Sequence, residues 1–201
     1  AQMFDSIRIS VTKTPNFYGN FNTRNSFISN YRAQVKGISA GISYNKQFTM
    51  ALGYNWLITD FESVINEKDT ATLKLRYVSP FVEYSFLEKN NFIVSIPIYL
   101  GFGQSFYETK NKEKFKKNFM VLYEPGMKVT YRFLRYISIS AGVGYRVVLV
   151  GNSKLIENFN SPTYTIGVGL FIGDIYKYGK KKMVQIQQLK QYNLTLKSYL
   201  N

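Results

Sequence analysis

The sequence predicts an all-β protein in which eight antiparallel strands close into a barrel. The first observation is the stretch Phe119–Val150, whose arms Phe119–Phe133 and Ile137–Leu149 alternate between apolar residues and small or charged ones. Successive side chains of a strand point to opposite sides of a sheet, so each arm has one continuous apolar face. The second observation is that the rest of the chain largely repeats this hairpin, with short turns and long loops in alternation.

Composition narrows the class further. Hydrophobic residues make up 45% of the chain, but no run approaches the roughly 20 apolar residues that a membrane helix needs. The chain contains neither Cys nor His, which removes disulfides, thiolate metal sites and the commonest general base. No second domain is visible, so we expect a barrel over residues 1–178 and a basic tail over residues 179–201.

Each strand is predicted from apolar residues at every second position, which together form one face of the strand. Asn-, Gly- and Ser-rich or charged stretches predict four long loops over Thr14–Ser29, Glu62–Ala71, Lys110–Asn118 and Asn152–Ser161. The apolar phase slips by one residue at Lys36–Gly37 and at Ser79–Pro80, which indicates β-bulges. The expected strands are Phe4–Lys13, Tyr31–Tyr44, Phe48–Ile58, Thr72–Leu87, one that begins at Phe92, Phe119–Phe133, Ile137–Leu149 and Tyr164–Ile172.

The apolar faces are expected to point outward into lipid. Together they carry about forty large side chains, whereas the interior of an eight-stranded barrel is only just wide enough for side chains to fill. Aromatic residues flank each short turn, as in an interfacial girdle, and lipid requires a closed ring of strands. The opposite faces suit a narrow lumen with a mixed-charge network of Arg8, Lys74, Arg76, Glu83, Glu124, Lys128, Arg132 and Arg146.

This pattern, over residues 4–175, resembles the small eight-stranded outer-membrane barrels of the OmpA/OmpX-like and porin-like families. The last strand, with Gly167, Gly169 and Phe171, is similar to the signal that barrel-assembly machinery reads. The resemblance implies a bacterial outer membrane with its lipid and lipopolysaccharide, long loops outside, and short turns and both termini in the periplasm. The start at Ala1 fits a mature chain from which a signal peptide has been removed.

Two charged loops are candidate binding sites. Lysines of the third loop could bind lipopolysaccharide phosphates, or they could form an ordinary solvated loop. The acidic second loop offers oxygen ligands for Ca²⁺ but lacks the spacing of a known calcium loop. The lysines are Lys110, Lys112, Lys114, Lys116 and Lys117, and the acidic loop holds Asp60, Glu62, Asn66, Glu67 and Asp69.

Catalysis is not expected. Barrel enzymes of this kind rely on a rim His that this chain lacks, and Glu83 and Glu124, the candidates for a carboxylate mechanism, fit an ion-pair network better. No cofactor is expected. The net charge of +14 raises nucleic acid as a partner, but no recognition helix is available, so nucleic acid is not expected either.

The tail is basic and has apolar residues at helical spacing. It could be an interfacial helix, a docking segment for a protein partner or a frayed end, and we favour docking. The first hypothesis is therefore an accessory subunit of an envelope complex for secretion, barrel assembly or nutrient uptake. The alternatives are a stand-alone OmpX-like barrel that binds ligands through its loops and a lipid-modifying enzyme. The docking residues would be Lys180, Lys181, Lys182, Met183, Ile186, Leu189, Tyr192 and Leu196.

Overall fold

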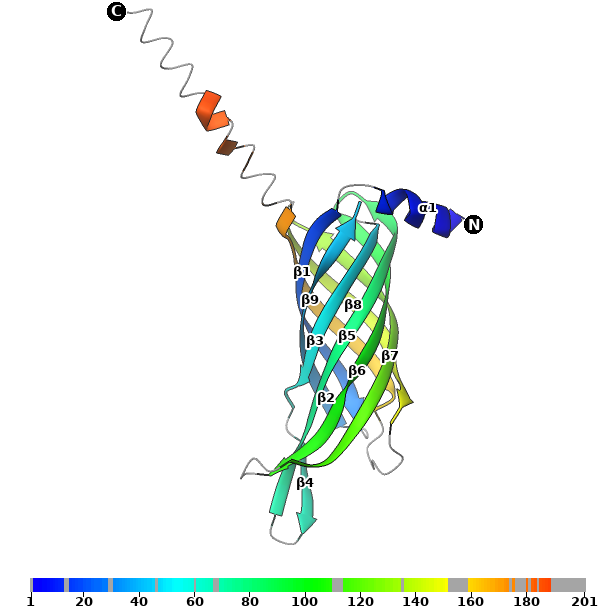
Figure 1. Ribbon diagram of the computed structural model, residues 1–201, viewed down its shortest axis with the longest axis vertical. Coiled ribbons are helices and arrows are strands. Elements are labelled where there is room, and N and C mark those ends of the chain that lie inside the picture. The colour runs from blue at the N-terminus through cyan, green and yellow to red at the C-terminus, as the bar shows by residue number, and fades with distance from the viewer. Residues whose placement is uncertain are drawn as a thin grey trace, which may run out of the picture.

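The protein is a closed β-barrel with a helix at its N-terminus (Figure 1). The computed structural model describes residues 2–12, 15–28, 31–45, 47–59, 61–66, 69–109, 114–134, 136–151, 159–173, 175, 180, 182–183 and 185–188. Its elements are α1 (Gln2–Val11), β1 (Pro15–Ile28), β2 (Tyr31–Tyr44), β3 (Phe48–Leu57), β4 (Phe61–Asn66), β5 (Asp69–Lys89), β6 (Phe92–Thr109), β7 (Lys114–Arg132), β8 (Ile137–Val150) and β9 (Ser161–Phe171).

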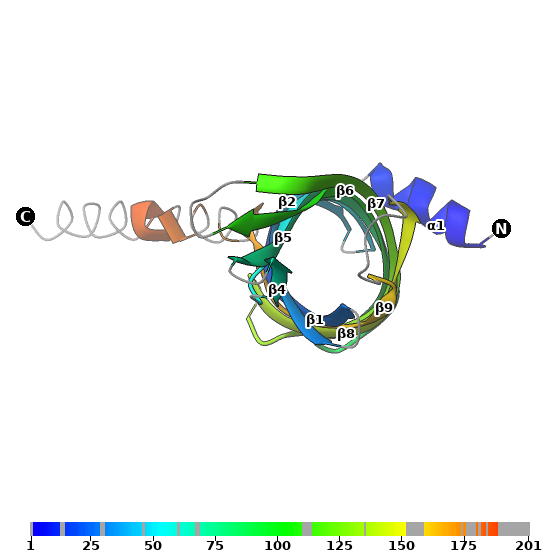
Figure 2. The same cartoon turned by 90° about the horizontal axis from the view of Figure 1, so that it is seen from below.

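Strand pairing closes the sheet on itself. The sheet order is β3-β2-β1-β9-β8-β7-β6-β5-β4, and an additional pairing of β3 with β5 completes the ring. β4 pairs with β5 alone, so it lies outside the ring, which leaves eight of the 9 strands to form it. Every neighbouring pair is antiparallel, and the view along the axis shows the closed ring (Figure 2). The predicted fold class is therefore confirmed.

The N-terminal prediction is wrong, because Phe4–Lys13 is not a strand. Most of it belongs to α1, whose first turn holds Asp5 and whose last turn holds Arg8, both favourable toward the helix dipole. The Ser10 hydroxyl donates to Gln47 Oε1 at 2.6 Å, which ties the helix to the turn between β2 and β3. Among the described residues, no helix is long and apolar enough to cross a membrane.

Two predicted loops are largely strand. Thr14–Ser29 contains β1, whose lumen-facing positions are rich in Asn and Ser and therefore read as loop in the sequence. Glu62–Ala71 contains most of β4 and the start of β5, which form a hairpin beyond the ring. The third predicted loop also ends early, since β7 begins at Lys114. Of the fourth loop, residues 152–158 lie outside the described part of the chain.

Neither predicted β-bulge exists. The pairing of β2 with β1 is continuous through Lys36 and Gly37, and the register of β5 with β6 is the same on both sides of Ser79–Pro80. The apolar residues change from one face of the strand to the other because the lining of the lumen changes from apolar to polar along the barrel. Val35 is 0% exposed and points inward, whereas Ile38, three positions on, is 50% exposed and points outward. Apolar residues therefore occupy first one face of a regular strand and then the other.

The outer wall forms a continuous apolar belt. A soluble monomer rarely exposes a contiguous apolar patch above a few hundred Å², so this surface fits lipid and not water. Aromatic pairs flank the belt, with Phe92 and Tyr131 at 4.8 Å between ring centroids near one end and Tyr54 and Trp56 at 5.8 Å near the other. The belt includes Phe17, Phe21, Ile38, Met50, Leu52, Val78, Val82, Ile96, Ile98, Leu100, Phe102, Met127, Val129, Ile139, Val143, Ile166, Val168 and Leu170.

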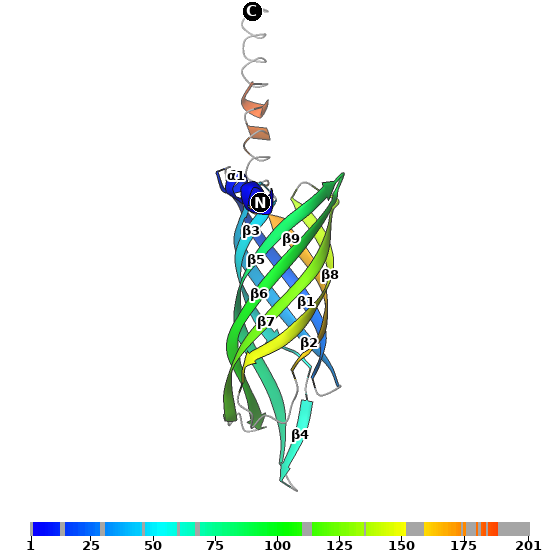
Figure 3. The ribbon, with the colours of Figure 1, turned by 90° about the vertical axis from the view of Figure 1, so that its right-hand side faces the viewer.

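The two ends of the barrel differ. We call the end with the short β2–β3, β5–β6 and β7–β8 connections the turn end and the opposite end the loop end. α1 and the C-terminal end of β9 lie at the turn end, and β4 lies at the loop end (Figures 1 and 3). A membrane-spanning strand needs only about 9–11 residues. β5, β6 and β7 have 21, 18 and 19 residues, so with β4 they project past the belt, and we call this projecting part the sheet extension.

Candidate functional site

A charged cluster occupies the middle of the lumen. Arg24 Nη1 lies 3.2 Å from Glu124 Oε2, and Arg146 Nε lies 3.6 Å from the same oxygen. Arg24 also donates to the Tyr77 hydroxyl at 3.4 Å and stacks 4.1 Å above the Tyr99 ring centroid. One carboxylate thus compensates two buried guanidinium groups, and the cluster ties β1, β5, β6, β7 and β8 together across the lumen.

A second ion pair lies nearer the turn end. The Lys128 ammonium contacts Glu83 Oε2, and the Ser95 hydroxyl donates to Glu83 Oε1 at 2.8 Å. All three side chains are buried. The pair joins β5 to β7 across β6, the strand between them, which contributes Ser95.

A third ion pair lies at the mouth of the turn end. Arg132 Nη2 lies 3.6 Å from Glu88 Oε1, and its guanidinium carbon lies 5.0 Å from the centroid of the Phe171 ring. The Glu88 side chain is 44% exposed. Tyr18 packs on Phe171 with ring centroids 5.5 Å apart, so aromatic rings narrow this mouth.

Three of the eight predicted lumen residues lie elsewhere. Arg8 is exposed on α1, because the segment is a helix outside the ring. Lys74 and Arg76 lie on the outer face of β5, because the strand keeps its phase through Ser79–Pro80. The other five, Glu83, Glu124, Lys128, Arg132 and Arg146, have buried side chains that face the lumen.

Sequence reasoning missed Arg24, which contacts Glu124, Tyr77 and Tyr99 in the lumen. It falls in the stretch predicted as the first long loop. A usable signal was present, since Phe17, Phe21 and Phe27 share one parity of that stretch and Tyr18 and Arg24 the other. Asn20, Asn22 and Ser26 obscured it, because lumen-facing polar residues have the composition of a loop.

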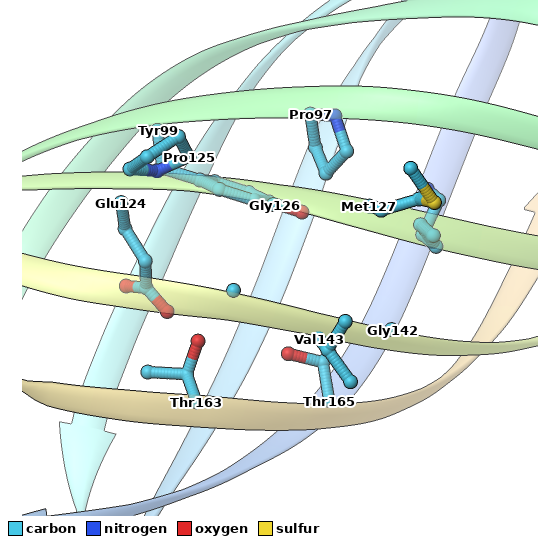
Figure 4. Close-up of a pocket in the computed structure, with 12 residues that line it drawn as sticks. Pro97, Tyr99, Glu124, Pro125, Gly126, Met127, Gly142, Val143, Thr163 and Thr165 are labelled. Carbon is cyan, nitrogen blue, oxygen red and sulfur yellow. The ribbon is translucent and has the colours of Figure 1, made fainter.

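Two small cavities lie in the lumen. A cavity of about 20 Å³ lies beside Glu124, where the inward positions are Gly126, Gly142 and Gly144, and Figure 4 shows the Glu124 carboxylate pointing toward Thr163. Such a volume holds about one water molecule. A second cavity of about 20 Å³ lies at the turn-end mouth. Neither of these two cavities has room for anything larger than water.

The predicted loop lysines lie partly on the sheet extension. Lys114 and Lys117 are exposed on β7. Lys110, Lys112 and the side chain of Lys116 lie outside the described residues, as do the side chains of the acidic stretch 60–69 that was considered for Ca²⁺. Within the portion that is described, no group of three or more acidic residues could hold a metal ion.

The described residues of the tail are helical. Met183 is 64% exposed and Ile186 is 45% exposed, so the apolar stripe has no partner within the described chain. Lys180 and Lys182 are exposed as well. Lys181, Leu189, Tyr192 and Leu196 lie outside the described residues.

Comparisons with known proteins bear on the fold. No protein-family model and no curated protein sequence matches the chain. Neisserial surface protein A is 14% identical, with a TM-score of 0.59 over 78% of this chain and 96% of that one. The OprF N-terminal barrel of Pseudomonas aeruginosa (13% identity, TM-score 0.49, 78% and 98% covered) and Ail of Yersinia pestis (10%, 0.48, 78% and 96%) also align. The chain has the fold of a small eight-stranded outer-membrane β-barrel.

Proposed function

We propose that the protein is a stand-alone, non-enzymatic barrel of the bacterial outer membrane that contacts anionic ligands or surfaces outside the cell through its loop end. The observation that carries this proposal is the sheet extension. It continues three strands of the barrel past the apolar belt as a hydrogen-bonded sheet, and it carries the exposed cations Arg76, Lys114 and Lys117.

The outer-membrane location is supported by the apolar belt together with the closed ring. Barrels of this fold have short turns on the periplasmic side and longer connections outside. We therefore place the turn end and both termini in the periplasm and the loop end outside the cell. The sheet extension then lies where it meets surfaces and ligands first.

A structural lumen supports the non-enzymatic part of the proposal. Glu83 and Glu124 each pair with buried cations, so neither is free to act as a general acid or base. The water-sized cavities also argue against a role as an open channel. The barrel would then be a rigid support for the extension.

The particle mass tests whether the barrel stands alone. The tagged protein is extracted from its own membrane in mild detergent and weighed by light scattering. We expect one 23.3 kDa chain per micelle. Other chains present in fixed ratio would contradict a stand-alone barrel.

Charge substitution tests the contact surface. The double variant K114Q/K117Q should bind dextran sulfate several-fold more weakly than the wild type, with both held in phosphatidylcholine nanodiscs. K180Q/K182Q is the matched control, because it removes the same charge at the turn end. Equal loss in both variants would show that net charge alone drives binding, against a specific role of the extension.

The exposed stripe of the tail supports a second candidate, an accessory subunit that docks a periplasmic partner through Met183 and Ile186. Removal of residues 179–201 should then leave the barrel inserted but release a co-purifying chain. If the same chains co-purify with the truncated barrel, the tail is not the docking segment.

A further inference from the structure

The outer wall of the sheet extension carries a groove of about 370 Å³, far larger than the lumen cavities. It lies over β3, β5, β6 and β7 at the loop-end limit of the apolar belt. Its lining combines cations with apolar and aromatic side chains, the principal ones being Arg76, Lys114, Lys117, Phe106, Tyr54 and Phe102.

The cations gather around one aromatic ring. The guanidinium carbon of Arg76 lies 5.9 Å and the Lys114 ammonium 5.2 Å from the Phe106 ring centroid. Phe106 faces outward but is only 6% exposed. No described carboxylate lies within ion-pair distance of Arg76, Lys114 or Lys117, although Glu108 is the register partner of Lys114. Among the residues that the structure describes, the groove is therefore a positive site with no paired carboxylate.

A β-bulge lets Lys114 and Lys117 face the same groove although they lie three residues apart. In the β6–β7 ladder, Ser105 pairs with Asn118 and Tyr107 with Phe115, so residues 116 and 117 oppose the single residue Phe106. Bulges re-aim side chains and are common beside functional sites. Lys117 keeps the outward parity of Phe119, and the extra residue turns Lys114, three positions away, to the same face of the strand.

The groove straddles the boundary between the apolar belt and water. One row of register partners, Tyr54, Val78 and Phe102, is apolar and exposed. In the adjacent row toward the loop end, Arg76 pairs with Gln104, and both are exposed and polar. A lipid seated in the groove would have its phosphates beside the polar row and its acyl chains along the apolar row.

We propose that this groove binds the phosphorylated head of one lipopolysaccharide molecule of the surrounding leaflet, its lipid A part. Arg76, Lys114 and Lys117 hold a phosphate, and Tyr54, Val78 and Phe102 lie along the first acyl chain. A free phosphate or polyanion would leave that apolar row unused, which is why the lipid is the occupant. The inference rests on the proposed function, since it requires the loop end to face outward.

The test measures lipid A retained by the barrel. Each variant is purified from its own outer membrane in mild detergent, and bound lipid A is counted by native mass spectrometry. We expect the wild type to retain one lipid A molecule per barrel. The bound fraction should fall about fivefold in R76Q and further in K114Q/K117Q, because each cation contributes about 1 kcal/mol near an anionic interface. K89Q, with the same charge loss at the turn end, should retain it like the wild type.

A second arm separates the lipid from other anions. Intact lipid A and its deacylated head group are titrated into lipid-free barrel in detergent, and the lipid should bind at least tenfold more tightly. Equal affinities, or equal retention by R76Q and K89Q, would overturn this inference. If lipid A retention were unaffected but K114Q/K117Q still lost dextran sulfate binding in nanodiscs, the lipid site would be contradicted and the proposed function would not.

Discussion

The loop-end half of the lumen is packed with apolar side chains, whereas the middle and the turn-end half are filled by ion pairs and hydroxyl groups. The apolar cluster contains no charged residue among its described members, and it meets the charged cluster at Tyr77, whose hydroxyl accepts from Arg24. In the polar half, the buried charges are compensated by charges of opposite sign. The apolar cluster comprises Ile28, Ala33, Val35, Leu57, Ala71, Leu73, Leu75, Tyr77, Tyr107, Met120, Leu122 and Phe159.

The outer surface explains why both solutions are available. Lipid requires apolar side chains outside along the whole belt, so the inner positions are free to vary as long as they fill the space. Apolar side chains fill most of the loop-end half, and ion pairs hold distant strands together in the other half. The two halves should therefore respond differently to substitution.

The largest effect is expected from Glu124→Gln. It leaves Arg24 and Arg146 buried without a counter-ion, which should cost about 3–5 kcal/mol of unfolding free energy. Urea titration in detergent micelles, followed by tyrosine and tryptophan fluorescence, measures the change. A loss below about 1 kcal/mol would mean that the cluster contributes little.

A cavity in the apolar half should cost nearly as much. Leu75→Ala removes a side chain that is 1% exposed, and the expected loss is about 2–5 kcal/mol. Leu75→Met, which keeps the volume, should cost less than about 1.5 kcal/mol in the same titration. If both variants lost equal stability, packing would not be what holds this half.

The mouth of the turn end should be tolerant. Glu88→Gln removes a half-exposed partner of Arg132, so we expect a loss of about 0–1 kcal/mol. The shift in urea midpoint, relative to Glu124→Gln, reports the difference between an exposed and a buried ion pair. Equal midpoint shifts in Glu88→Gln and Glu124→Gln would show that burial does not change what an ion pair contributes to stability.

The smallest effect is expected when a whole ion pair is replaced. Glu83→Leu combined with Lys128→Met removes both charges, and Ser95 keeps the Lys128 carbonyl oxygen as an acceptor at 3.4 Å. The double variant should lie within about 1 kcal/mol of the wild type, while Lys128→Met alone should lose about 3–5 kcal/mol. A double-mutant cycle in which the two losses simply add would contradict this coupling.

The same division of the lumen explains which features could be predicted from the sequence. Hairpins such as Phe119–Val150 alternate cleanly over most of their length, because their inner residues beyond Leu122 are mainly small or polar and their outer ones mainly apolar. Where the lumen becomes apolar, at Val35 and Leu75, both faces of a strand look alike to a hydropathy pattern and the phase appears to slip.

The N-terminal misassignments have a related cause. Ile7, Ile9 and Val11 alternate as a strand would, but Phe4, Ile7 and Val11 also have helical spacing. Tertiary contact decides between them, through the bond from Ser10 to Gln47, which no local pattern contains. The place of Arg24 likewise depends on the partner strand β9, which lies far along the chain.

The central claim is a membrane-spanning barrel with its loop end outside the cell. The natural chain has no Cys, so single cysteines can be placed at will. Arg32→Cys and Lys89→Cys mark the loop end and the turn end, and a bulky, membrane-impermeant maleimide is applied to cells before and after permeabilisation of the outer membrane. We expect Arg32→Cys to react on intact cells and Lys89→Cys to react only after permeabilisation. The reverse pattern would contradict the orientation, and reaction of both only in a soluble fraction would contradict the membrane barrel itself.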